Sequence, residues 1–229
     1  LLIGLFTAMA SGGAVVAAQY MGHGDKEMVG RASNQLFLAV GGVALLFMMI
    51  ALIWNRGLLA LLYGNVEADV MNAARIYFYI VAVSFPFLGI YNGGAALFRA
   101  VGDSKVSMKV SLVANLVNIA GNAVLIFGFH MGVAGAAIST LASRILMSII
   151  MICRQRVPKQ EIVIRDYFSI RPDMKLILII LSVGIPSGIE NGMFQFGKLA
   201  IQSTVSTLGT TAIAAQAMTI IFELSLIHI

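Results

Sequence analysis

The chain has 229 residues, of which 59% are hydrophobic and 11% are charged, with a formal net charge of +5. A soluble domain is about 45–50% apolar and about 25% charged, so this chain carries too little charge to cover a water-facing surface. High hydrophobicity with modest net charge excludes a disordered chain, and the single cysteine, Cys153, excludes a disulfide scaffold. The composition predicts an integral membrane protein.

Six apolar runs are long enough to cross a bilayer, since a spanning helix needs about 20 mostly apolar residues. They are residues 1–20, 36–54, 76–98, 106–129, 133–152 and 176–207, and a seventh run starts near Thr211. The short alternating segments typical of barrel strands are missing, so we expect an all-α membrane protein, a polytopic helical bundle. Because Leu1 and Ile229 both lie within apolar runs, we expect a piece of a longer chain.

Basic residues are concentrated in alternate loops. Segments 21–31, 99–109 and 154–175 hold Lys26, Arg31, Arg99, Lys105, Lys109, Arg154, Arg156, Lys159, Arg165, Arg171 and Lys175, whereas the opposite loops hold Arg56 and Arg75. This bias predicts that the first set is cytoplasmic. It also accounts for the net positive charge, so we expect no nucleic-acid partner and a multi-pass protein of the cell (plasma or inner) membrane.

The one long connection runs from Arg154 to Lys175 and carries Pro158 and Pro172. It indicates a linker between two helical bundles. We therefore divide the chain into an N-terminal bundle (1–155), a cytoplasmic linker (156–175) and the start of a C-terminal bundle (176–229).

Residues suited to catalysis are scarce. The chain has no HExxH, no DxxD and no Cys/His cluster, and His23, His130 and His228 are far apart in sequence. Nucleophilic or metal catalysis has almost no suitable groups. We expect no enzyme activity, no metal site and no cofactor.

Ionisable residues within the predicted spans are Arg144, Glu190, Lys198 and Glu223. A charge at mid-bilayer costs a few kcal/mol even on lenient insertion scales, so each is a functional candidate. Arg144 lies near enough to the cytoplasmic end of its span to snorkel toward it. Glu190 lies about 22 Å along its span at 1.5 Å per residue, which makes it the deepest candidate.

The run 176–207 carries a polar stripe. Its members recur every three or four residues and fall within an arc of about 100° on a helix: Ser187, Asn191, Gln195, Lys198, Gln202 and Ser206. Interhelical hydrogen bonds worth about 0.6–2 kcal/mol each are one explanation. A water-accessible pathway is the interpretation we favour, because such a stripe must face protein or water rather than lipid.

A shorter stripe lies in the run 106–129 and consists of Ser111, Asn115, Asn118 and Asn122. Helix packing is its simpler interpretation, and the three asparagines are also candidates for lining the same cavity. Pro86 and Pro186 interrupt apolar runs, and each removes a backbone hydrogen bond and bends its helix. They are our candidate hinges.

Several motifs resemble those of the multidrug and toxin extrusion (MATE) transporters. Gly22-His23-Gly24-Asp25 resembles the family's Gly-x-Gly-Asp loop, and Arg99-Ala100-Val101-Gly102-Asp103 is similar to its Arg-Ala-x-Gly-Asp loop. Further similar stretches are Asn115 and Asn118 with Ile126-Phe127-Gly128, the run 132–137, and Gly184-Ile185-Pro186 with Leu208-Gly209 and Ala214-Ala215-Gln216. In the two loops we expect Gly to make tight turns and Asp to cap the next helix.

The resemblance implies a fold of two six-helix bundles, of which this chain covers the second helix to the start of the eighth. It implies export of a small, cationic amphipathic molecule by alternating-access antiport against H⁺ or Na⁺. Many members carry a Glu in the seventh helix about two turns past its Pro. Here Phe194 holds that place and Glu190 lies one turn earlier, so Glu190 is the candidate cation or proton acceptor.

The alternative is a flippase for lipid-linked oligosaccharides, which belongs to a related branch with the same helical plan. Such a protein is expected to need a strongly cationic cavity for pyrophosphate. Within the spans only Lys198 and Arg144 supply positive charge, so antiport is the preferred hypothesis.

Overall fold

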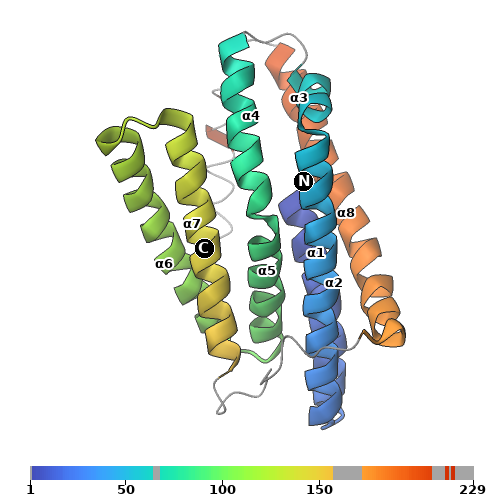
Figure 1. The fold of residues 1–229 in the computed structure, drawn as a ribbon. Helices are drawn as coiled ribbons and strands as arrows, with labels where there is room; N and C mark the ends of the chain where they lie inside the picture. Colours follow the sequence, from blue (N-terminus) through green and yellow to red (C-terminus); the bar gives the residue numbers. More distant parts are fainter. Residues whose placement is uncertain (1, 64–67, 157–171, 208–214, 217, 220–229) are drawn as a thin grey trace.

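The computed structural model describes residues 2–63, 68–156, 172–207, 215–216 and 218–219. Its elements, in chain order, are α1 (Leu2–Gly22), α2 (Lys26–Ile53), α3 (Asn55–Tyr63), α4 (Ala68–Val83), α5 (Phe85–Ala100), α6 (Ser104–Asn122), the π-helix η1 (Ala123–Gly128), α7 (Gly132–Gln155) and α8 (Met174–Thr207) (Figure 1). Within these ranges every element is helical, which confirms the all-α prediction. Residues 157–171 of the expected linker and most of the expected seventh run lie outside the described residues.

The described helices include four that are long and apolar enough to cross a membrane. They are Glu27–Ile53, Ser104–Gly128, Gly132–Gln155 and Met174–Lys198, and the pair Met71–Val83 and Phe85–Ala100 makes a fifth span if it is counted as one. The runs predicted from the sequence at 36–54, 106–129, 133–152 and 176–207 fall on these four helices. Our expectation that residues 1–20 also cross stays a prediction.

The predicted span 76–98 is not one straight helix. It breaks at Ser84, where α4 and α5 meet at a bend of 47°. Pro86 lies in the first turn of α5, where the missing N–H of proline has no partner to lose. A second difference is α3, which lies in a segment that we expected to be a loop.

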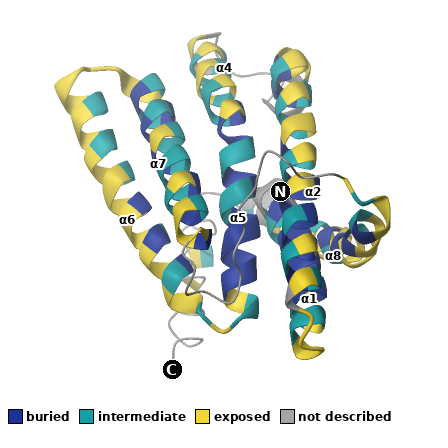
Figure 2. Cartoon of the chain, turned by 60° about the horizontal axis from the view of Figure 1, so that its bottom comes forward, coloured by how far each residue is buried: buried dark blue, intermediate teal, exposed yellow. Residues whose placement is uncertain are grey.

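The helices form a row across the bundle (Figures 1 and 2). α6 packs against α7 at one edge, and α7 packs against α4 and α5 in the middle. α5 and α2 pack against α1, and α8 covers α1 at the other edge. The sixth crossing predicted from sequence, α8, is therefore packed directly on the N-terminal bundle, whereas the proposed division at residues 156–175 stays a prediction.

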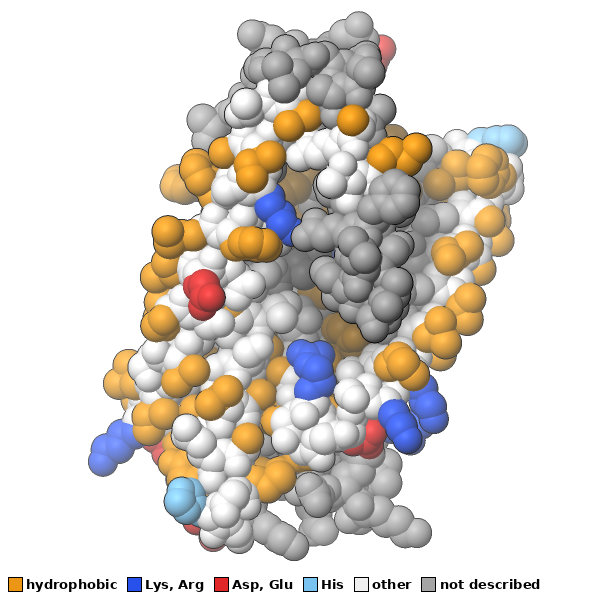
Figure 3. All heavy atoms as spheres, turned by 180° about the vertical axis from the view of Figure 1, so that it is seen from behind, with side chains coloured by type: hydrophobic (Ala, Val, Ile, Leu, Met, Phe, Trp, Pro, Cys, Tyr) orange, Lys and Arg blue, Asp and Glu red, His pale blue; other side chains and the backbone are white. Residues whose placement is uncertain are grey.

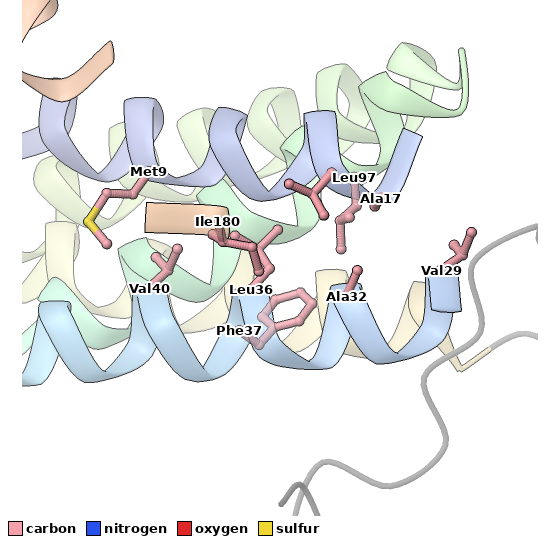
Figure 4. Close-up of a cluster of buried hydrophobic side chains, with 10 residues drawn as sticks. Met9, Ala17, Val29, Ala32, Leu36, Phe37, Val40, Leu97 and Ile180 are labelled. Carbon is pink, nitrogen blue, oxygen red and sulfur yellow. The ribbon is translucent and has the colours of Figure 1, made fainter. Parts of the chain in front are cut away.

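The main hydrophobic core joins α1, α2, α5 and α8. Leu36 and Val40 of α2 pack between Met9 of α1, Leu97 of α5 and Ile180 of α8, and all are buried (Figure 4). Because one residue from each helix meets the others here, removing any one helix would expose the rest of this core.

The two Gly-Asp loops form tight turns on the predicted cytoplasmic side. Gly24 and Gly102 have φ angles of +75° and +81°, a conformation that glycine adopts without steric cost. The carboxylate of Asp25 accepts a hydrogen bond from the Met28 amide at 3.0 Å, which confirms the predicted cap. Asp103 stands at the same position before α6, but its side chain makes no capping hydrogen bond. Gly22 ends α1, and Arg99 lies in the last turn of α5.

Backbone contact between α1 and α8 depends on two glycines. A Cβ atom on Gly12 would lie 2.6 Å from the Gly184 nitrogen and 2.9 Å from the Ile180 carbonyl oxygen. A Cβ atom on Gly184 would lie 3.1 Å from the Met9 Cα. The two helices run in opposite directions at this point. Small residues permit this spacing between membrane helices, and any larger side chain would force them apart.

We predict that Gly12→Ala lowers the free energy of unfolding of the full-length protein by about 1–3 kcal/mol, the usual cost of overpacking. Gly42→Ala in α2 is the matched control, because its Cβ would meet nothing within 4 Å and alanine favours helix by about 0.5–1 kcal/mol. Thermal unfolding in detergent measures both. Equal melting temperatures for the two variants would contradict the close α1–α8 contact.

Candidate functional site

The polar stripe of α8 continues the helical face that packs on the N-terminal bundle, and its members Asn191 and Lys198 are themselves exposed. Leu176, Ile180, Gly184 and Gly188 are buried, and helical periodicity places Ser187, Asn191, Gln195 and Lys198 on the same face further along the helix. The stripe therefore begins within one turn of the close contact at Gly184. It continues toward the end of the bundle at which α1 begins.

The opposite face of α8 is apolar and exposed. Ile189, Met193 and Phe196 are 59%, 72% and 71% exposed, and they lie about half a turn away from the stripe. Large apolar side chains exposed on one face of a membrane helix are suited to lipid contact. α8 thus has one face fit for acyl chains and one face fit for protein or water.

Glu190 and Lys198 of α8 are both exposed. The Lys198 ammonium lies 4.6 Å from the centre of the Phe194 ring, so the ring provides a cation–π contact. Glu190 lies beside the stripe, about 60° from its edge. Asn191 donates a hydrogen bond to the Ser187 carbonyl at 2.9 Å, and the side chain of Gln202 lies outside the described residues.

The asparagines of α6 meet hydroxyl groups of α7. The Asn118 amide nitrogen lies 3.3–3.5 Å from the hydroxyl oxygens of Ser139, Thr140 and Ser143. Ser139 donates a hydrogen bond to the Asn118 carbonyl at 2.8 Å, and Asn122 donates to the Asn118 side-chain oxygen at 3.2 Å. We call these five residues the Asn118 cluster. Interhelical hydrogen bonding, the simpler of our two interpretations, accounts for its contacts.

Two features set the Asn118 cluster apart from plain helix packing. The side-chain oxygen of Asn122 is buried without a hydrogen-bond donor among the described residues. The helix then widens directly into η1, and π-helical turns are frequent at functional sites. Asn115 is exposed and takes no part in the cluster, although the sequence grouped it with Asn118 and Asn122.

Arg144 does not extend toward the cytoplasmic end of α7. Its guanidinium donates a hydrogen bond of 2.6 Å to the hydroxyl of Ser84 at the α4–α5 break, and that hydroxyl donates to the Val81 carbonyl at 2.5 Å. The expectation that Arg144 snorkels was therefore wrong. A buried acceptor is available within the bundle because the helix break leaves Ser84 facing α7.

Sequence reasoning missed the partners of these groups. Ser139 and Ser143 are four residues apart, with Thr140 between them, and this spacing was a usable signal for a polar face on α7. No comparable signal marked Ser84, because a lone serine in an apolar run is common in membrane helices. The pairing of each asparagine with a particular hydroxyl depends on how α6 packs on α7, which a local sequence pattern does not show.

Known proteins similar to this chain are transporters. It is 30% identical over 229 residues to the probable multidrug resistance protein YoeA of Bacillus subtilis, covering 94% of this chain and 47% of that protein. It is 26% identical over 219 residues to the probable multidrug resistance protein NorM of Thermotoga maritima, covering 90% and 45%. The chain thus spans about half the length of the curated relatives that it matches.

The fold is also similar to that of solved transporters. A crystal structure of MATE in the bent conformation superimposes with a TM-score of 0.84 at 20% identity, covering 94% of this chain and 48% of that one. The model of the MatE family matches residues 1–124, which is more than half of the 229 residues. The chain therefore belongs to the MATE family, a family of multi-pass membrane transporters for small molecules rather than of enzymes.

Proposed function

We propose that the full-length protein exports drugs from the cell by alternating-access antiport against H⁺ or Na⁺. The observation that carries the proposal is that α8 has two different faces: Ile189, Met193 and Phe196 form an exposed apolar face, and the polar stripe continues the face that packs on the N-terminal bundle. Family membership and the names of the relatives support export of multiple drugs. Such exporters act in the cell membrane, which is where we place this protein.

Asn191, Gln195, Lys198 and Gln202 line the substrate path in this proposal. Exporting an amphipathic molecule requires polar groups at membrane depth that water can reach, and these four lie on one helical face. Phe194 lies at the edge of that face, where its ring already contacts the Lys198 ammonium. The same ring would contact the positive charge of an organic cation, which supports a cationic substrate.

Glu190 is the acceptor of the driving ion. A carboxylate within a membrane span is costly and is usually retained for a function. Its exposure beside the stripe leaves it accessible to a proton or Na⁺. The Asn118 cluster offers polar groups at a second place in the bundle, where the unsatisfied Asn122 oxygen would accept a hydrogen bond from water or substrate.

The α4–α5 break is the moving joint of the N-terminal bundle. Alternating access requires helices that change their relative angle, and a break at Ser84 with Pro86 in the next turn is suited to bending. The hydrogen bond from Arg144 links the joint to α7. Pro186 is a second candidate hinge, although α8 continues through it as one helix.

The positions of the basic side chains within the spans do not support the flippase alternative. Arg144 lies on α7 and Lys198 on α8, and these two helices make no packing contact within the described residues. Arg144 also donates a hydrogen bond to the Ser84 hydroxyl. A pyrophosphate group would need several cations on the same cavity wall.

The first prediction for function concerns Glu190. In inverted vesicles containing the full-length protein, we expect gradient-driven accumulation of a fluorescent organic cation, and Glu190→Gln to lower its initial rate about tenfold. The neutral amide cannot accept the driving ion. A pH gradient imposed without Na⁺ is compared with a Na⁺ gradient imposed at equal pH, which shows which gradient drives transport.

Glu27→Gln is the matched control, because Glu27 is exposed at the start of α2 and pairs with Arg31 at 2.8 Å. We expect it to transport at the normal rate. Unchanged transport by Glu190→Gln would remove this carboxylate from the mechanism, and no transport under either gradient would contradict antiport.

The second prediction concerns the joint. Ser84→Ala removes the acceptor for Arg144, so we expect the free energy of unfolding to fall by about 1.5–3 kcal/mol, the usual value of a hydrogen bond to a charged group. The drug efflux rate should fall as well. Ser182→Ala is the control, because the Ser182 hydroxyl is exposed and bonds only to its own helix at the Ile179 carbonyl. Identical melting temperatures and efflux rates for the two variants would contradict a role for the Arg144–Ser84 hydrogen bond in stability and transport.

A further inference from the structure

A pocket of about 340 Å³ lies between the predicted cytoplasmic ends of α6 and α7. Lys105 and Lys109 line it from α6, and Arg154 lines it from the last turn of α7. Its apolar floor includes Val106 and Val110. The pocket is remote from α8, since α6 and α7 occupy the opposite edge of the bundle (Figure 2).

The pocket carries an excess of positive charge. Among the described residues that line the pocket, three basic side chains accompany one carboxylate, that of Asp103, so this lining has two more positive than negative charges. Arg31 and Glu27 form an ion pair on α2, away from this pocket. Lys105, Lys109 and Arg154 are all exposed, so their charges are available to an external anion.

An exposed apolar strip continues directly from the two lysines. Lys105 and Lys109 share one face of α6 with Leu112 and Leu116, which are 58% and 60% exposed. Figure 3 shows hydrophobic side chains spread along most of the length of the protein. Most of the Lys and Arg side chains on this face lie in its lower half. A ligand that fits both features has an anionic head and an apolar tail.

We propose that this pocket binds an anionic phospholipid of the inner leaflet. The phosphate lies among Lys105, Lys109 and Arg154, and an acyl chain lies along Leu112 and Leu116. Basic pockets between membrane helices on the cytoplasmic side are suited to anionic headgroups. Lysines that only set topology need no concave site, whereas here two helices supply charge to the same pocket. The site does not depend on the proposed drug transport.

Native mass spectrometry of the full-length protein tests the proposal. Purified protein is titrated with phosphatidylglycerol or with phosphatidylcholine of identical acyl chains. We expect phosphatidylglycerol to be retained preferentially and K105Q/K109Q to weaken its binding about tenfold. R31Q/K175Q removes the same charge elsewhere on the cytoplasmic side and should bind normally, and K105R/K109R should also bind normally.

Arg154→Gln provides a second variant on the other wall of the pocket, in case the α6 double variant folds poorly; it should also weaken phosphatidylglycerol binding. Equal retention of the two lipids would overturn the proposal, as would equal loss in K105Q/K109Q and R31Q/K175Q. Displacement of phosphatidylglycerol by millimolar inorganic phosphate would overturn the lipid assignment and identify a site for soluble phosphate.

Discussion

A polar group carried into a bilayer needs a partner from protein or water, because lipid offers none. This constraint organises most of the molecule. Backbone groups are satisfied within helices, and the Asn118 amide is satisfied by hydroxyls of α7. The Arg144 guanidinium donates a hydrogen bond to Ser84 at a helix break. In the stripe of α8, Asn191 and Lys198 are exposed, and in our proposal water along the substrate path is their further partner.

The contact between Gly12 and Gly184 gives that stripe its direction. Because α1 and α8 touch through backbone atoms, α8 cannot rotate about its axis without losing the contact. Ile180 further locks it into the core formed by α1, α2 and α5. Because α8 is a regular helix, the orientation of Gly184 also fixes the direction in which Gln195 and Lys198 point. The contact between Gly12 and Gly184 thus determines which side chains share its helical face further along α8.

Much of this arrangement could be predicted from the sequence, and some of it could not. Apolar run lengths located the crossings, since the bilayer sets a minimum length, and the Gly-Asp loops identified two turns. Gly24 and Asp25 behave as predicted, but Asp103 has the same motif without the capping bond. The sequence did not predict the break at Ser84. Pro86 suggested a bend within one continuous helix, whereas in the structure Pro86 lies in the first turn of a new helix, α5. The partners of Asn118 and Arg144 depend on which helices are neighbours, and no local pattern contains that information.

The central claim is that the α8 stripe faces an aqueous path while the opposite face contacts lipid. Substituted-cysteine accessibility tests it most directly, in the full-length protein with the exposed Cys153 replaced by serine. Gln195→Cys is compared with Met193→Cys, since the two positions lie on opposite faces of the same helix. The account predicts rapid modification at position 195 by a charged, membrane-impermeant thiol reagent and slow modification at position 193. Equal rates, or faster modification at position 193, would contradict it.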